Sequence, residues 1–388
     1  MARRLCSPPE LIKLSSESED VEVKKMAFLL LEELVFKDKE YEQPLNHLLL
    51  ADLSEFFFDY ASAMNLLKKL QTLILPEIDN ELNQLVEDVY VSDNCRSENQ
   101  KVYFDNADKD NCTSPISLAH YQLEEPRSET EKIFKFMFEQ CDEGKWIEKH
   151  IVSSFYRRLT NINSNEIEDI FVLDKTDREK LVKHGFCSEL PHDSQIVRIL
   201  RDMDIALQYA IEWANHNETE INTEFIQEVH SLVIKSNRFE EREENEIVVI
   251  PIRKWRRTTV FHGKTVFPFF EEVPELIENF LEVVNQILKE MKENRSVEAT
   301  TAFSNAAYIH NSFVEIHPFT DGNGRTARII ASLPLLIVGL PPICVRSCQR
   351  NTYFDVIVKT RKEKDLSILA KFLAEEMLAS VQESEDYV

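Results

Sequence analysis

Glycine is scarce in this chain, and the scarcity limits how often the backbone can turn tightly. Only six of the 388 residues are glycine, and two of them flank one asparagine in the segment HPFTDGNGRTAR at 317–328. Glycine is the residue that most readily adopts left-handed backbone conformations in tight turns. So few glycines favour a chain of long helices, and they make the pair at 317–328 informative.

Apolar residues elsewhere recur at intervals of three and four, the spacing of amphipathic helices. The clearest stripe begins after Ser194 and runs through Ile196, Ile199, Met203 and Leu207. Similar patterns predict helices within 21–90, 217–237, 274–294, 297–317 and 351–373, with Thr223 as one N-cap. Pro334 falls inside the apolar segment after 317–328 and is expected to kink a helix there. The fold class is therefore predicted to be mainly α.

One segment departs from this pattern. Residues 245–270 are rich in Val, Ile, Thr and Phe, and Gly263 stands at a turn position. This composition predicts a β-hairpin, the one hairpin expected in the chain. An isolated hairpin is marginally stable by itself. We therefore expect residues 248–270 to form a flap that packs over another part of the protein. Trp255 and the aromatic residues at 267–270 would anchor it.

Three regions are distinguished along the chain. Residues 1–90 are interpreted as a helical N-terminal extension of unknown role, and 91–127 as a polar linker or long loop. Residues 128–388 form the predicted core. The extension is either a partner-binding or dimer-forming region or a structural addition, and the sequence leaves both open.

Composition narrows the partners and the compartment. The formal net charge is −24, which repels phosphate backbones and anionic lipid, so neither nucleic acid nor a membrane surface is an expected partner. Seven cysteines show no zinc-site spacing, since Cys344 and Cys348 have no second pair. We expect reduced thiols and a soluble cytoplasmic protein, because neither a secretory signal nor a spanning segment is evident.

The segment 317–328 combines the chemical groups that phosphoryl-type transfer requires. Gly322, Asn323 and Gly324 lead into an apolar helix, whose N-terminal N–H groups and dipole favour an anion. Arg325 and Arg328 are three residues apart and project to one side, where they suit phosphate oxygens. Two further groups complete the set: Asp321 suits a hard cation such as Mg²⁺, and His317 a general base.

Two familiar phosphate- and cation-binding motifs fit this segment less well. A P-loop needs GxxxxGK[ST], and an EF-hand needs further acidic ligands where Arg325, Thr326 and Ala327 stand. DGNG by itself is typical of a simple turn. The histidine before it and the two arginines after it favour a phosphate site over a turn.

The segment matches the Fic-domain signature HxFx[DE]GNGRxxR at every fixed position. The resemblance extends over roughly 130–380. KWRRTTVFHGKTVFPFFEEVPELIENFL is similar to the Fic flap and the helix after it, and NTYFDVIVKTRKEKDLSILAKFL to the closing helices. The resemblance implies a Fic-type helical bundle that transfers AMP from ATP to a Ser, Thr or Tyr hydroxyl of a target protein.

The resemblance also implies residue roles. His317 would deprotonate the target hydroxyl, and Asp321 would hold Mg²⁺ or Mn²⁺ on the α- and β-phosphates. The backbone at Gly322, Asn323 and Gly324 would form the anion hole. Arg325 would hold the β-phosphate region and Arg328 the γ-phosphate. Asn351 and Tyr353 lie where members of the family often contact the adenine base of the nucleotide. The target-binding flap comprises Thr258, Thr259, Val260, Phe261 and His262, and it would pair with the target as a strand.

A second family element is an inhibitory helix with the pattern [ST]xxxE[GN]. Here Ser164 and Glu168 fit, near 160–170, but Asp169 replaces Gly or Asn. The resemblance implies that Glu168 competes with the γ-phosphate for Arg328. An ordinary solvated helix residue is the simpler alternative.

Three functions are consistent with the sequence. The first is a protein adenylyltransferase held down by Glu168. The second is a Fic enzyme that mainly removes AMP, with Glu168 positioning the attacking water, or that moves another phosphate-containing group. The third is a silent Fic-fold scaffold, which would have no need of the base His317. A homodimer is also possible.

Overall fold

The computed structural model describes residues 18, 20–37, 44–71, 85–86, 89–90, 131–132, 150–185, 195–216, 219–241, 246–262, 265–293, 299–385 and 387. The predicted linker at 91–127 and the turn residue Gly263 lie outside these residues. The chain forms two compact units. One contains Met1–Ala107 and Arg238–Pro251, and the other Asp108–Asn237 and Ile252–Val388.

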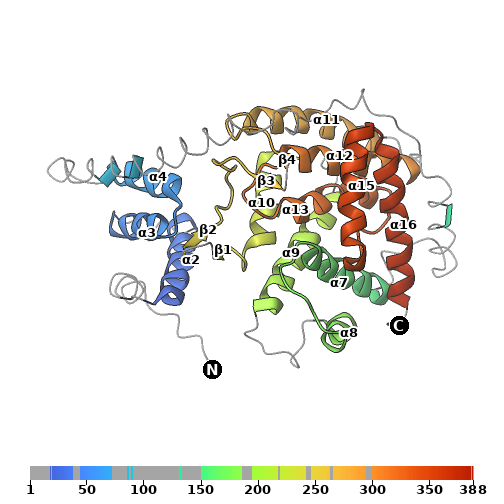
Figure 1. Ribbon diagram of the computed structural model, residues 1–388, viewed down its shortest axis with the longest axis horizontal. Coiled ribbons are helices and arrows are strands. Elements are labelled where there is room, and N and C mark those ends of the chain that lie inside the picture. The colour runs from blue at the N-terminus through green and yellow to red at the C-terminus, as the bar shows by residue number, and fades with distance from the viewer. Residues whose placement is uncertain are drawn as a thin grey trace. The chain divides into compact units, whose positions relative to one another are not determined.

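The described residues of the first unit include helices α2 (Val21–Lys37), α3 (Pro44–Phe56) and α4 (Tyr60–Gln71) (Figure 1). Its core includes Phe28 and Phe57, whose rings meet edge to face at 5.6 Å. Strands β1 (Phe239–Glu241) and β2 (Ile247–Val249) pair antiparallel in the same unit. The segment Arg238–Pro251 therefore packs with the N-terminal helices, although sequence assigned it to the core of 128–388.

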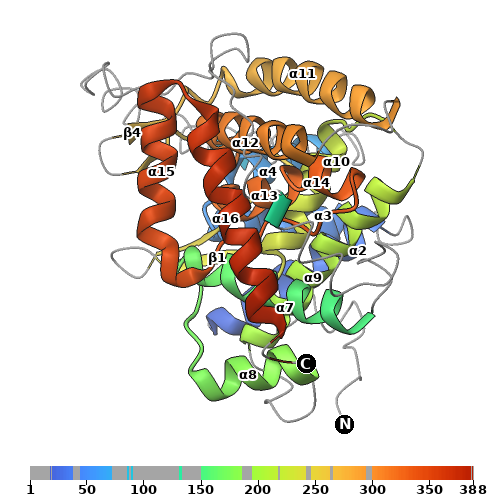
Figure 2. The same ribbon diagram turned by 90° about the vertical axis from the view of Figure 1, so that its right-hand side faces the viewer.

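Within its described residues, the second unit is a helical bundle with a short hairpin. Its elements are α7 (His150–Ile167), α8 (Lys175–His184), α9 (Gln195–Asn215), α10 (Thr223–Ile234), β3 (Phe261–His262), β4 (Thr265–Val266), α11 (Val273–Glu293), α12 (Ala299–Ile316), α13 (Asn323–Ile330), α14 (Leu333–Ile337), η6 (Ser347–Gln349), α15 (Arg350–Glu363) and α16 (Leu366–Glu385). Helix α12 packs against α11, α13, α14 and α16, and Figure 2 shows α15 and α16 side by side.

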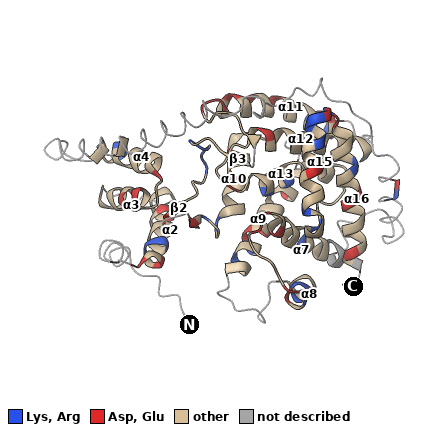
Figure 3. Ribbon diagram, in the orientation of Figure 1, with Lys and Arg blue, Asp and Glu red and all other residues tan. Residues whose placement is uncertain are grey.

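Small and apolar side chains explain why α12 lies at the centre. Ala302, Ala306 and Ala307 are fully buried, and short side chains let neighbouring helices approach closely. The stripe predicted after Ser194 is the buried face of α9, including Met203 and Leu207. Helix α11 is amphipathic: Val273, Ile277, Phe280 and Val284 are buried, whereas its glutamates, which are red on the ribbon of Figure 3, are exposed.

The mainly helical prediction is confirmed. The expectation of one hairpin is wrong for the described residues, because β1–β2 forms a second antiparallel pair besides β3–β4. Val248 and Val249, which sequence placed at the start of the flap, belong to that other pair. Local composition identified the strand-forming residues, but it could not tell that two separate pairs share them.

Two helix boundaries also differ in detail. Asn222, rather than Thr223, caps α10, with its side chain accepting from Phe225 N at 2.9 Å. Pro334 does not kink one long helix: α13 ends at Ile330, and Pro334 stands in the first turn of α14. Proline is tolerated there because the first turn leaves its N–H groups unbonded within the helix. Among the described helices, none combines the length and apolar character that crossing a membrane requires.

Candidate active site

A tight loop delivers the chain from α12 to α13. Gly322 caps α13 with φ 78°, in the left-handed region. A Cβ at this position would also lie 2.7 Å from Cγ2 of Ile234 on α10. Both the backbone conformation and the close approach of α10 therefore require glycine.

Side chains hold this loop from both ends. Asn323 accepts from Phe319 N at 2.9 Å and donates to Phe319 O at 2.7 Å. His230 stacks on Phe319 with ring centroids 3.6 Å apart, and its Nε2 lies 3.0 Å from Asp321 O. Sequence singled out the backbone at Asn323, but its amide side chain closes the loop as well.

Arg328 lies at the centre of the site and is 2% exposed. Its Nη2 donates to Glu168 Oε1 at 2.7 Å and to Ser164 O at 2.8 Å, while Nε donates to Ser164 Oγ at 2.9 Å. Burial lowers the pKa of Arg328, but the Glu168 carboxylate and Tyr353 outweigh burial and leave that pKa raised. The ion pair implied by the resemblance is thus present, and it joins α13 to the end of α7.

Glu168 also touches the start of α13. A Cβ added to Gly324 would overlap Glu168 Oε1 and lie 3.0 Å from its Cδ. The carboxylate therefore fills the space that this glycine leaves open at a helix N-terminus. That place suits any anion, since N–H groups and the helix dipole converge there.

The Gly324→Ala variant tests whether this space is also the phosphate site. In a Glu168→Gly background we expect AMP transfer from ATP to fall on the order of 100-fold, because the new methyl group excludes the phosphate as it excludes the carboxylate. Transfer of label from α-labelled ATP gives the rate. Gly339→Asn is the control, since no atom lies within 4 Å of a Cβ there and asparagine tolerates the φ of 81°. Full activity of the Gly324→Ala chain would separate the two anion positions.

The backbone conformation of Asp169 explains why the inhibitory-helix pattern has Gly or Asn after its glutamate. It follows Glu168 with φ 55°, a left-handed conformation that costs other residues about 1 kcal/mol. Arg350 offsets this cost: its Nη2 donates to Asp169 Oδ2 at 2.5 Å and its Nε to Ile167 O at 2.6 Å. Arg350 therefore holds the end of α7, next to Glu168, from α15.

Loss of this support is expected to loosen Glu168. The Arg350→Met variant should raise the basal transfer rate a few-fold, roughly 5-fold at most, because a solvent-exposed ion pair contributes about 0–1 kcal/mol. Initial rates with α-labelled ATP measure the effect. In a Glu168→Gly background the same variant should change nothing, and a similar gain there would show that Arg350 acts elsewhere.

Arg325 and Asp321 form the other half of the site. Arg325 is fully buried and donates to Asp321 Oδ2 at 3.1 Å and to Asn165 Oδ1 on α7 at 3.5 Å. The Asp321 side chain is 43% exposed, so its carboxylate remains accessible to a cation. No cluster of three or more metal-ligating side chains occurs in the described ranges. Asp321 alone fits Mg²⁺, which commonly takes one or two carboxylates and completes its shell with phosphate and water.

His317 directly follows α12 with φ 51°. Its ring stacks on Phe267, after β4, with centroids 3.8 Å apart and planes at 20°. Nδ1 lies 3.3 Å from Val314 O. A carbonyl only accepts, so this contact favours the proton on Nδ1 and leaves the lone pair on Nε2. If His317 accepts a proton, Nε2 is therefore the nitrogen that would do so.

The remaining predicted residues divide between the flap and α15. Phe261 is 41% exposed on β3, Thr259 is buried, and Thr258 and Val260 are half-buried. His262 pairs with Thr265 across the hairpin. Asn351 is exposed on α15, whereas Tyr353 is 1% exposed.

Tyr353 is buried and contacts Arg328, whereas a contact with the nucleotide base was expected. Its hydroxyl lies 3.3 Å from Arg328 Nη1 and 2.6 Å from His310 Nε2. Burial, together with Arg328 and Arg361, lowers the pKa of His310 to about 3. His310 is therefore neutral at physiological pH and serves as a buried partner of Tyr353.

Sequence reasoning missed three residues that shape the site, namely Asn165, Arg256 and Arg350. It also did not anticipate that the Tyr353 hydroxyl contacts Arg328. Asn165 lies on the turn before Glu168 and is visible as a polar residue on a helix, but its contact with Arg325 spans 160 residues. Arg350 contacts residues 181 and 183 positions away. Local sequence patterns do not predict contacts between residues so far apart in the chain.

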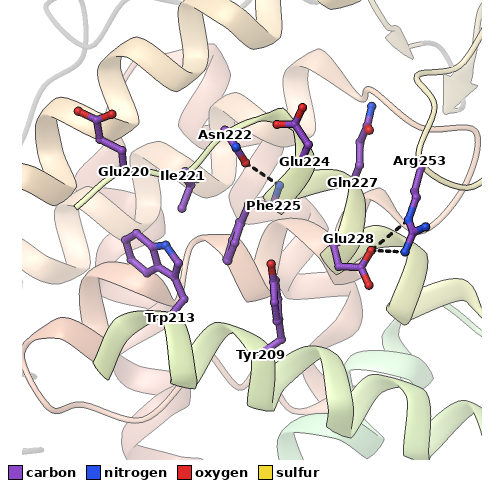
Figure 4. A pocket seen from close by; sticks show the side chains of 10 residues that line it. All are labelled: Tyr209, Trp213, Glu220, Ile221, Asn222, Glu224, Phe225, Gln227, Glu228 and Arg253. Carbon is purple, nitrogen blue, oxygen red and sulfur yellow. Dashed lines mark hydrogen bonds and ion pairs between the residues drawn. The ribbon is translucent and has the colours of Figure 1, made fainter. Parts of the chain in front are cut away.

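A groove of about 750 Å³ lies between α9 and the start of α10 (Figure 4). Tyr209, Trp213 and Phe225 line it with aromatic rings, and Glu228 bonds Arg253 at 2.6 Å. Asn222 and Glu224 on its rim stand at the N-terminus of α10, where cap and acidic residues are favoured. None of the residues predicted for catalysis lines this groove.

A known protein family matches the part of the chain that contains the loop before α13. Residues 220–335 match the family model described as Fic/DOC family. A protein named "Protein adenylyltransferase Fic" from Drosophila grimshawi is 29% identical over 173 residues, 45% of this chain and 32% of that protein. A protein of the same name from Drosophila persimilis is also 29% identical, over 45% of this chain and 30% of its own length. The matched part is thus about a third of these relatives.

A solved structure supports the fold. A Fic-domain-containing signaling protein from Bacteroides thetaiotaomicron has a TM-score of 0.51 at 16% identity, covering 68% of this chain and 96% of its own. Fic-1 from C. elegans has a TM-score of 0.48 at 17% identity and covers 98% of both chains. The chain thus contains a region, residues 220–335, that matches the Fic/DOC family, and this region includes the loop, the two arginines and the histidine described above.

Proposed function

We propose that this chain is an ATP-dependent protein adenylyltransferase held in check by Glu168. One observation carries the proposal: a carboxylate lies between Arg328 and Gly324 at the N-terminus of α13, where an ATP phosphate would bind. The relatives named as adenylyltransferases support the reaction class. By analogy with these relatives, ATP would donate the AMP group and a protein hydroxyl would accept it.

Each residue then has one task in the reaction. His317 Nε2 takes the proton of the target hydroxyl, whose oxygen attacks the α-phosphorus of ATP. The bond from the α-phosphorus to the bridging oxygen breaks, so that AMP stays on the target and pyrophosphate leaves. Arg325 and the α13 N-terminus stabilise the charge on the phosphates. Mg²⁺, held by Asp321, would neutralise phosphate charge.

Glu168 controls this reaction through Arg328. While the carboxylate bonds Nη2, the guanidinium cannot hold the γ-phosphate in the same place, and ATP binds without correct alignment. Alignment of the reacting atoms is worth several kcal/mol to such reactions. Release of Glu168 therefore frees both the cation and the space above Gly324.

Labelled ATP tests the proposed function. Wild type, Glu168→Gly and Glu168→Gly/His317→Ala chains are incubated with Mg²⁺ and either α-labelled or γ-labelled ATP, alone and with cell lysate. We expect protein labelling from α-labelled ATP only, strong with Glu168→Gly, weak with wild type and absent without His317. Labelling from γ-labelled ATP would instead indicate phosphate transfer. No labelling in any arm would contradict the proposal and favour a scaffold.

The same materials examine the reverse reaction. Target modified by the Glu168→Gly chain is purified and returned to wild type or Glu168→Gly. Release of AMP by wild type alone would show that Glu168 also promotes removal. Stable label with both chains would restrict the enzyme to addition.

A further inference from the structure

Arg256 is a buried cation that no carboxylate pairs with among the described contacts. It precedes the flap strands and is 2% exposed. Burial lowers its pKa to about 10, against a smaller opposing effect of Glu272, so the side chain still carries its charge at pH 7. A buried charge is costly unless its hydrogen bonds are satisfied. The acceptors that satisfy it therefore indicate what this cation holds together.

All of those acceptors are main-chain carbonyls. Nε donates to His317 O at 2.6 Å, and Nη1 donates to Thr258 O at 2.8 Å. Nη2 donates to Pro268 O and, at 3.4 Å, to Ile316 O. The backbone N–H of Arg256 donates to Pro318 O at 2.9 Å.

These carbonyls belong to two different parts of the site. Ile316, His317 and Pro318 lie at the end of α12, where the helix dipole favours a cation. Thr258 and Pro268 stand on either side of the β3–β4 hairpin. One rigid guanidinium thus joins the base residue to both ends of the flap, a geometry that the planar fork of arginine suits and lysine does not.

The same contacts account for the backbone of His317. Its φ of 51° is uncommon for a residue other than glycine and needs support from its surroundings. Arg256 supplies it on the carbonyl side, and the ring of His317 stacks on Phe267, next to Pro268. Neither Gly324, Arg325 nor Arg328 contacts Arg256 in the described hydrogen bonds.

We propose that Arg256 is a positioning residue that fixes the flap and the base His317 in one register, so that a hydroxyl held by the flap lies within reach of Nε2. This inference rests on the proposed transfer reaction and concerns its chemical step. Nucleotide binding depends on α13 and is independent of Arg256.

The test uses the full chain with Glu168→Gly, to which Arg256→Lys or Arg256→Met is added. Single-turnover transfer of AMP from α-labelled ATP to the protein itself gives the rate, and calorimetry with ATP in a His317→Ala background gives the Kd. We expect the rate to fall about 100-fold for Arg256→Met and less for Arg256→Lys, as misplacement by about 1 Å produces, with the ATP Kd changed less than 2-fold. Arg157→Lys is the control, because that arginine joins α7 to α9 through Asp204 at 2.8 Å.

Amide hydrogen exchange separates this inference from the proposed function. Arg256→Lys should speed exchange at 258–268 and around His317, while α13 and α15 keep wild-type rates, whether or not the chain transfers AMP. Arg256→Lys also covers the case that Arg256→Met does not fold. Unchanged exchange at 258–268 with an unchanged rate would overturn the inference. So would rate and ATP affinity falling in the same proportion, since that marks a general structural role.

Discussion

Replacing Glu168 with glycine is expected to raise the rate of AMP transfer about 5- to 150-fold, the range of a coupling free energy of about 1–3 kcal/mol. The variant removes the carboxylate that bonds Arg328 at 2.7 Å and fills the space above Gly324. Both the cation and the anion site then become available to ATP. Initial rates of labelling with α-labelled ATP measure the gain.

Glu166→Gln is the matched control for this variant. Glu166 lies two residues earlier on α7, but it bonds Arg178 at 2.7 Å rather than Arg328. Its substitution should leave the rate unchanged, while Glu168→Gln, which keeps the shape and loses the charge, should fall between wild type and Glu168→Gly. Equal rates for wild type and Glu168→Gly would contradict the inhibitory role.

The second large effect is expected at His317. In the Glu168→Gly background, His317→Ala should lower the transfer rate about 10²- to 10⁴-fold, the usual contribution of a general base. The ATP Kd should change less than 2-fold, because the phosphate contacts come from α13. His216→Ala, at an exposed histidine of the same unit, should keep the full rate.

A residual rate within tenfold of the parent would show that His317 is not the base. His310 could not replace it, because the pKa of about 3 keeps its buried ring neutral and the ring already contacts Tyr353. The comparison of the two histidines thus assigns the base by location and by charge state.

The helical fold and the loop before α13 could be predicted from the sequence, because both depend on local patterns. Helix α9 and the segment 317–328 are specified by residues close together in the chain: an apolar stripe in one case, and two glycines before a helix in the other. Local patterns of this kind are set by backbone geometry and burial, which a single sequence records directly. The ion pair of Glu168 with Arg328 required the family resemblance as well.

Contacts between distant segments could not be predicted in the same way. The separate pairing of β1 with β2 depends on the core around Phe57, whose carbonyl accepts from Val249 N at 3.0 Å. The support of Asp169 by Arg350 and of His317 by Arg256 likewise joins segments that no local period relates. Tyr353 shows the limit most clearly: its position suggested a base contact, whereas its burial makes it a partner of Arg328.

Glu168 and the γ-phosphate are expected to compete for one place, and calorimetry with ATP and ADP measures this competition directly. In a His317→Ala background with Mg²⁺, Glu168→Gly should tighten ATP binding by about 10- to 100-fold, the value of a hydrogen bond to a charged group. ADP binding should change less than 2-fold, and a further Arg328→Met substitution should abolish the ATP gain. Equal changes for ATP and ADP, or none for either, would contradict the account.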